Sequence, residues 1–310
     1  MTELVSAISL GSVTSENIAF GIAPHINAAG RMASADEAVK LFRSSDDTVI
    51  KTQVEKLVDF NRRRRNEQET AYNEASRMIT GDEDIILLEM ENIHEGIGGI
   101  VAGKIKENYY RPVIIVTPSG DDCVKGTGRS IPRIDIYRLL KQHDEFFERF
   151  GGHSSACGFL MKRELFDDFK ALLRRDVAAM KVSNPDLFAK ENVWELEIYP
   201  EEITVDLAKK LELMEPFGQG NPRPMFMIKN IVPESVRFMG ADETHVRFYA
   251  SGGSGISVGM RQSAECILFR KAQEKKHLIC SGRPVDLTGT INIKEWRGRE
   301  SVQFVIEEIR

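Results

Sequence analysis

Hydrophobic and polar positions along the chain change their period several times, and each change predicts a different element. Residues 8–33 are rich in Gly, Ala, Ser and Asn and show no clear period, so we interpret them as the end of a domain. Ser34 and Asp36 are placed to cap a short helix. From Asp46, apolar residues recur at helical spacing as far as Gly81. This predicts a helix roughly 50 Å long, a length typical of a connector between domains.

Apolar strands then alternate with amphipathic helices up to residue 180. The predicted elements are, in order, strand 84–90, helix 97–108, strands 112–117 and 123–127, helices 134–140 and 144–149, strand 156–161 and helix 164–180. This order predicts a compact α/β domain of about a hundred residues.

The pattern changes again after a polar break at residues 181–192. A strand at 193–199 and a helix at 205–213 are followed by short alternating runs between glycine and proline clusters. These runs lie at residues 225–231, 235–239, 245–250, 256–260, 278–282, 285–293 and 301–306. Many short strands with such punctuation predict a small β-barrel or sandwich.

Composition narrows the class of protein. The 310 residues are 42% hydrophobic and 29% charged, which suits a globular chain of two domains, and no apolar run is long enough to cross a bilayer. The four cysteines (Cys123, Cys157, Cys266 and Cys280) lack CxxC spacing, which argues against structural zinc and favours a reducing cytoplasm. With a net charge of −5, any nucleic-acid site requires basic groups gathered on one surface.

The stretch from Phe150 to Phe159 carries the most informative chemistry. Gly151 and Gly152 let the backbone approach a ligand closely, and His153 follows as a donor to a phosphate. A plain tight turn explains the same three residues equally well.

Two stretches upstream have a similar character. In residues 24–31, Asn27 and Arg31 are suited to a phosphate, although a capped loop packed on a neighbouring helix explains them too. In residues 94–103, His94 opens a glycine-rich turn between a strand and a helix. Such a turn binds anions or lets a helix pack closely on a sheet.

A third stretch, residues 126–132, places Thr127, Arg129 and Ser130 on a backbone relaxed by glycine. The guanidinium fork of arginine suits a phosphate, and the two hydroxyls add donors. A simple turn is the alternative.

Two basic segments remain, and each has two interpretations. Trp296, Arg297 and Arg299 lie at a predicted hairpin tip, suited to base stacking and phosphate contact or to an ordinary β-turn. The run 62–65 of four arginines is either a solvated helix face or a basic edge over a nucleic-acid groove. Residues 213–222 are interpreted as a rigid connector.

Metal-binding patterns are absent from the sequence. The six histidines are dispersed, and neither an Asp-His-His triplet nor an Asp-x-Asp after a strand occurs. No metal ligand is therefore expected in this chain.

Taken together and in order, these stretches resemble RecJ, the single-stranded-DNA-specific exonucleases of the DHH phosphoesterase superfamily. The matching pieces are residues 24–31, 94–103, 110–112, 126–130, 150–158, 215–222 and 298–303. The resemblance implies an α/β DHH-associated domain joined by a long connector helix to an N-terminal remnant and followed by an all-β OB-fold barrel. The implied boundaries are 1–33 for the remnant, 34–81 for the connector helices, 82–180 for the DHH-associated domain, 181–192 for a linker and 193–310 for the OB-fold.

The resemblance also implies an activity. The family hydrolyses phosphodiester bonds of single-stranded DNA in the 5′→3′ direction during DNA repair and recombination, with Mn²⁺ or Mg²⁺. The metal ligands are expected in a DHH domain that would precede residue 1, so this stretch alone is expected to bind DNA without cutting it. Thr127, Arg129 and Ser130 would hold the 5′ phosphate, and His153 the scissile or adjacent phosphate. Arg31 with Asn27 would guide the strand. The family often has serine where Thr127 stands, which keeps the hydroxyl.

The expected partner is single-stranded DNA, with a single-strand-binding protein or a helicase as further partners, in the cytoplasm. A nanoRNA or cyclic-dinucleotide phosphodiesterase is an alternative, but a strand-tracking barrel argues against small substrates. A non-catalytic nucleic-acid-binding module is a second alternative. An editing appendage of an aminoacyl-tRNA synthetase is a third, and no zinc-ligand set supports it.

Overall fold

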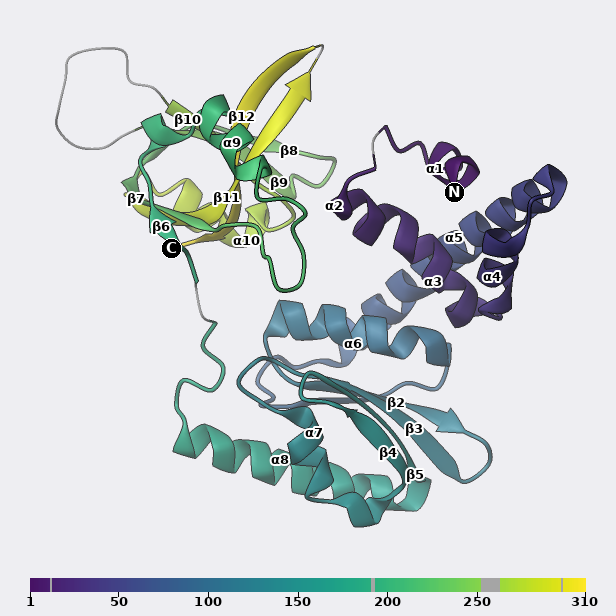
Figure 1. Cartoon of the computed structure of the whole chain (residues 1–310). Helices are drawn as coiled ribbons and strands as arrows, with labels where there is room; N and C mark the ends of the chain where they lie inside the picture. Colours follow the sequence, from purple (N-terminus) through teal and green to yellow (C-terminus); the bar gives the residue numbers. More distant parts are fainter. Residues whose placement is uncertain (12, 191–192, 252–262, 297) are drawn as a thin grey trace. The chain divides into compact units, whose positions relative to one another are not determined.

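Contacts divide the chain into two units, residues 1–190 and residues 191–310. The computed structural model describes residues 1–11, 13–190, 193–251, 263–296 and 298–310. The first unit consists of helices and a five-stranded sheet, and the second is built on a seven-stranded sheet (Figure 1). Among the described residues, no helix has the length and apolar character needed to cross a bilayer.

Helices make up the first part of unit one. They are α1 (Thr2–Ala7), α2 (Ser15–Asn17), a π-helical turn (Ile18–Ile22), α3 (Ala23–Met32), α4 (Asp36–Arg43) and α5 (Asp47–Met78). Helix α5 begins where the Asp46 carboxylate accepts the backbone N–H groups of Thr48 and Val49. Its 32 residues span about 48 Å, close to the length that the sequence predicts. The helices share a core that includes Leu4, Ile22, Ala29, Leu41, Val54 and Leu57.

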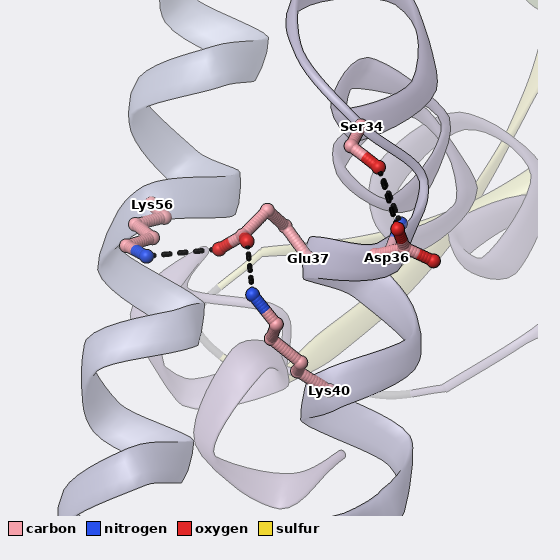
Figure 2. A network of polar contacts seen from close by, with 5 residues as sticks. All are labelled: Ser34, Asp36, Glu37, Lys40 and Lys56. Atoms are coloured by element: carbon pink, nitrogen blue, oxygen red, sulfur yellow. Dashed lines mark hydrogen bonds and ion pairs between the residues drawn. The ribbon is translucent and has the colours of Figure 1, made fainter.

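A polar network ties α4 to α5 (Figure 2). Glu37 of α4 accepts a hydrogen bond from Lys40 at 2.5 Å and from Lys56 of α5 at 2.8 Å. These two bonds lower the pKa of Glu37 to about 2. Beside them, Ser34 Oγ accepts the backbone N–H of Asp36 at 3.2 Å. The N-cap of α4 is Ala35, without a side-chain cap, so the capping expected of Ser34 and Asp36 is not the one observed.

A five-stranded sheet in the order β1-β2-β3-β5-β4 forms the rest of unit one. The strands are β1 (Ile86–Glu89), β2 (Val113–Ser119), β3 (Cys123–Arg129), β4 (Phe147–His153) and β5 (Ala156–Lys162). β1 and β2 are parallel and joined through helix α6 (Glu95–Tyr109), whereas the other pairs are antiparallel. The single parallel pair needs this helical crossover, and the remaining strands follow as hairpins or short connections.

Helices cover both faces of this sheet, with α6 on one face and α7 (Ile136–Lys141) and α8 (Phe166–Ser183) on the other (Figure 1). Ile97, Val101 and Ile105 of α6 pack on β1 and β2, with Ala71 and Ala75 of α5 in the same core. The long helix α5 is therefore held against α6 by apolar contacts. These contacts join the N-terminal helices to the face of the sheet that α6 covers.

Residues 15–32, whose sequence shows no clear period, are helical and contain a π-helical turn at Ile18–Ile22. One expectation for unit one is wrong. The helix expected over 144–149 ends as a 3₁₀ turn at Phe146 and is followed by β4. Phe147 and Phe150 are three residues apart, as on a helix face. Their rings nevertheless lie 5.2 Å apart on one strand, packed against the neighbouring strand.

The second unit is a mixed sheet in the order β6-β7-β11-β12-β10-β9-β8. Its strands are β6 (Leu196–Glu197), β7 (Phe226–Ile231), β8 (Pro233–Met239), β9 (His245–Ser251), β10 (Ser263–Leu268), β11 (Val285–Trp296) and β12 (Arg299–Ile309). Helices α9 (Val205–Glu212) and α10 (Ala272–Ile279) belong to it as well. The core includes Phe226, Phe248, Leu287 and Phe304.

The strand expected over 278–282 is also wrong, because helix α10 reaches Ile279 and a turn follows. Ala272 and Ile279 are both buried and lie seven residues apart, which is two helical turns. This spacing was hidden among the charged residues between them. The strand expected over 256–260 lies outside the described residues.

Candidate nucleic-acid interface

The first turn of helix α6 is the point where the helical part meets the sheet. His94 is the N-cap, and its Nδ1 accepts the backbone N–H of Gly96 at 3.1 Å. The guanidinium of Arg31, in the last turn of α3, donates to the Gly96 carbonyl at 2.9 Å. A Cβ at Gly96 would lie 2.5 Å from the Arg31 carbonyl oxygen, so glycine allows this contact. Arg31 thus belongs to a helix, and not to the capped loop that was the alternative explanation of residues 24–31.

Strand β3 brings two further groups to the same turn. Its glycines face α7 and α8, whereas Thr127 and Arg129 alternate toward α6. A Cβ at Gly99 would lie 2.8 Å from Arg129 Nη2 and 3.3 Å from Thr127 Oγ1. The absent side chain of Gly99 is therefore what makes room for the guanidinium.

The charge of Arg31 acts on two further guanidinium groups, those of Arg129 and Arg64. Burial lowers the pKa of Arg129, and the like charge of Arg31 lowers it further. Burial also lowers the pKa of Arg64 on α5, with additional effects of Arg65 and Arg31. Within the described part of the chain, no carboxylate forms an ion pair with Arg31, Arg64 or Arg129. Half-buried cations held together without a counter-charge suit an anionic ligand.

The sheet continues this site sideways onto two open strands. In register, Arg129 pairs with Ala156 and Ala156 pairs with His153, so these side chains project on one face. Thr127, Gly158 and Gly151 form the next row. We call Gly151, Ala156 and Gly158 the glycine shelf. His153 is exposed and lies two strand spacings, about 10 Å, from Arg129 across this shelf.

Gly152 has a different role from Gly151. Its φ is +149°, and a Cβ there would lie 2.3 Å from the Ala156 carbonyl oxygen. The turn that presents His153 therefore requires glycine at 152, whereas nothing lies within 4 Å of a Cβ at 151. The two interpretations of this stretch, a tight turn and an exposed histidine, are therefore compatible with each other.

Asn27 and Ser130, which were also predicted to contact the substrate, lie at the margin of this arginine cluster. Asn27 is exposed on α3, one helical turn before Arg31 and on the same side. Ser130 is only 4% exposed, and its hydroxyl has no hydrogen-bond partner among the described residues. Its backbone N–H donates to Ser155. Arg31, Thr127 and Arg129 therefore lie at the first turn of α6, whereas the Ser130 side chain is buried.

Sequence reasoning missed Arg64. The four arginines of residues 62–65 do not share one environment. Arg62 is exposed and paired with Asp59 at 2.5 Å, whereas Arg64 is half-buried. The usable signal is the buried Asn61 three residues earlier, which places position 64 on the inward side of α5.

The second unit has its own basic surface. Arg247, Lys294, Arg299 and Ser301 line a shallow depression of about 520 Å³ on β9, β11 and β12. Glu265 lies 4.0 Å from Arg247 and 3.6 Å from Lys294, so two of the three cations pair with the same carboxylate. The predicted hairpin tip is present in the backbone, where Trp296 pairs with Arg299. Arg297 and the side chain of Trp296 lie outside the described residues.

Within the described ranges, no three histidine, cysteine, aspartate or glutamate side chains are grouped to hold a metal ion.

Two family models match this chain, one on each unit. The DHHA1 domain matches residues 82–179, and the RecJ OB domain matches residues 194–308. The expected order of an α/β domain followed by an OB-fold is thereby confirmed.

Curated relatives are similar over most of the chain. The "Single-stranded-DNA-specific exonuclease RecJ" of Bacillus subtilis is 28% identical over 98% of this chain and 38% of its own length. That of Thermus thermophilus is 34% identical over 76% of this chain and 34% of its own. The crystal structure of Thermus thermophilus RecJ in complex with Mg²⁺ matches with a TM-score of 0.82 at 28% identity, covering 99% of this chain and 45% of that one. The chain thus spans less than half the length of these relatives, and over that span it belongs to the RecJ family, carrying its DHHA1 and OB domains.

Proposed function

We propose that this chain is the substrate-binding and DNA-binding part of a RecJ-like 5′→3′ single-stranded-DNA exonuclease that hydrolyses phosphodiester bonds in DNA repair and recombination. The observation that carries the proposal is the pair Arg31 and Arg129 at the first turn of α6, close to Thr127 and without a carboxylate partner in the described ranges. Such a pair binds a phosphate through charge-assisted hydrogen bonds.

The roles of the individual residues follow from their places. Arg129 and Thr127 bind the terminal 5′ phosphate beside α6, where the helix dipole adds favourable charge. The strand passes over the glycine shelf, whose exposed backbone admits a sugar-phosphate chain without steric conflict. His153 contacts the next or scissile phosphate at the far side of the shelf. Asn27 extends the Arg31 side. The Ser130 hydroxyl, which has no hydrogen-bond partner among the described residues, is the further donor to the 5′ phosphate.

The divalent ion of such an enzyme does not fit this cluster. Guanidinium groups repel Mg²⁺ and Mn²⁺, and hard cations require oxygen ligands. Two related crystal structures, from Thermus thermophilus, are of RecJ with Mg²⁺ and with Mn²⁺. In the proposed enzyme the metal ligands come from residues other than those described here, and this chain supplies phosphate binding rather than water activation.

The second unit binds the strand farther along. The depression around Arg247, Lys294 and Arg299 offers phosphate contacts. We place the protein in the cytoplasm because all four cysteines are free thiols. Single-stranded DNA is the partner, and a single-strand-binding protein or a helicase delivers it.

The proposal is tested with matched oligonucleotides that differ only in a 5′ phosphate or 5′ hydroxyl. Arg129→Ala removes a charge-assisted hydrogen bond of about 1.5–3 kcal/mol, which corresponds to roughly a tenfold to hundredfold loss in affinity. We expect this loss on the 5′-phosphorylated strand and little loss on the hydroxyl strand, measured by fluorescence anisotropy. An equal loss on both strands would remove the assigned role.

A further inference from the structure

A line of hydrogen-bonded side chains joins α3 to α5 and includes Arg64, one of the three guanidinium groups. His25 Nδ1 lies 2.7 Å from the carbonyl oxygen of Gly21, and His25 Nε2 lies 3.0 Å from Asn61 Nδ2. The other atom of that amide, Asn61 Oδ1, accepts a hydrogen bond from Arg64 Nε at 3.1 Å. Arg64 Nη1 then donates to Gln68 at 2.9 Å. Four side chains are thus joined in one line.

The direction of every hydrogen bond in this line is fixed by chemistry. A carbonyl only accepts, so His25 carries its proton on Nδ1 and leaves Nε2 as an acceptor. Asn61 must then turn its NH₂ toward His25 and its oxygen toward Arg64. Burial lowers the pKa of His25, with additional lowering by Arg65 and Arg64, which favours the neutral form that this arrangement needs.

The line holds Arg64 in a single orientation. Asn61 is 2% exposed and therefore cannot exchange these partners for water at low cost. Arg64 donates hydrogen bonds from Nε to Asn61 and from Nη1 to Gln68. It has no ion pair with a carboxylate in the described part of the chain. Among the described residues, Nη2 of Arg64 has no hydrogen-bond partner and remains for a ligand.

The environment of Arg64 is that of the phosphate site. Helix α5 packs on α3 and on α6, the two helices that carry Arg31 and Gly96. The charge of Arg31 acts on both Arg64 and Arg129. By contrast Arg62, two residues away, is 74% exposed and bound to Asp59.

We propose that Arg64 is a third guanidinium of the phosphate site beside Arg31 and Arg129, and that Asn61 and His25 are positioning residues that aim it at a phosphate of the bound strand. The ligand is a phosphate group of a polynucleotide, and this identity rests on the function proposed above. A phosphate bound at this site also explains why these half-buried guanidinium groups have no carboxylate partner in the described part of the chain.

The test uses the full chain and the oligonucleotide with a 5′ phosphate. Arg64→Gln should weaken its binding by about tenfold, the range of one charge-assisted hydrogen bond. Arg62→Gln, which changes the charge equally on the same helix, should stay within about twofold because an exposed pair contributes little. Arg64→Lys should lie between the two, because it keeps the charge and loses the fork.

Asn61→Leu tests the positioning role. This variant keeps every positive charge, so the slope of affinity against salt should stay unchanged. Its preference for the 5′-phosphorylated strand over the 5′-hydroxyl strand should fall by severalfold. A residue with only a structural role would lower the melting temperature without changing that preference.

The outcomes separate this inference from the proposed function. If Arg129→Ala weakens binding of the 5′-phosphorylated strand while Arg64→Gln behaves as Arg62→Gln does, the third guanidinium is refuted and the proposed function stands. If wild-type protein binds both strands equally, both fail. Thermal unfolding of each variant identifies any that does not fold, and for Arg64 the lysine variant then decides.

Discussion

Gly99 offers a substitution that should separate stability from binding. A Cβ at this position would lie 2.8 Å from Arg129 Nη2 and 3.3 Å from Thr127 Oγ1. The closer atom is the far end of a flexible side chain, so the guanidinium moves aside at small cost to the fold. Alanine also favours the helical conformation over glycine by about 1 kcal/mol. Gly99→Ala should therefore leave the protein as stable as wild type or slightly more stable.

Binding should respond in the opposite direction. Arg129 is displaced from the place where it faces the first turn of α6, and a charge-assisted hydrogen bond weakens steeply with geometry. We expect roughly a tenfold loss of affinity for a 5′-phosphorylated oligonucleotide, within the 1.5–3 kcal/mol of such a bond.

Gly103 provides the matched control on the same helix. Nothing lies within 4 Å of a Cβ built there, so Gly103→Ala should bring the helical stabilisation without any change in binding. Thermal unfolding and fluorescence anisotropy on both variants give the two readouts. If Gly99→Ala binds the 5′-phosphorylated strand as Gly103→Ala does, our account of how Gly99 and Arg129 share space is refuted.

Two further predictions concern the remaining parts of the chain. The pKa of Glu37 is lowered from 4.5 to about 2, so its contribution to stability is present above pH 4.5 and is lost as the pH falls toward 2. Glu37→Gln should accordingly flatten the acid side of the melting-temperature profile, and an unchanged profile would contradict the network in Figure 2. In the second unit, Arg299→Ala should reduce the salt slope of binding to a long single strand by about 0.7. Lys229→Ala, whose lysine is paired with Glu197, should not, and equal slopes in both variants would argue against the depression as a binding surface.

The local sequence pattern was sufficient to predict those elements whose apolar spacing and capping residues indicate the same boundaries. The long helix from Asp47 has a side-chain cap at Asp46, and its apolar residues keep helical spacing before and after the polar stretch 61–70, so its length could be predicted. Strand β4 could not, because its Phe147 and Phe150 have helical spacing and gain their strand conformation from pairing with β5. Long-range pairing of this kind leaves no trace in a local window.

The candidate site divides in a similar way. Arg31, Thr127, Arg129 and His153 stand in glycine-rich stretches, and the structure places the first three together with His153 across the glycine shelf. Arg64 lies in a run of identical residues, where only its distance from a buried asparagine distinguishes it. The assigned roles, like the domain boundaries inferred from the sequence, remain predictions.

We propose that Arg129 binds the terminal 5′ phosphate and that Arg31 contacts the strand beside it. The most direct test of this pair follows the arginine Nε–H signals by nuclear magnetic resonance, assigned with the Arg129→Lys and Arg31→Lys variants. On titration with a 5′-phosphorylated oligonucleotide, both signals should shift, and the 5′-hydroxyl strand should leave the Arg129 signal in place. If the phosphorylated strand binds while both signals stay unchanged, the phosphate lies elsewhere and the account is wrong.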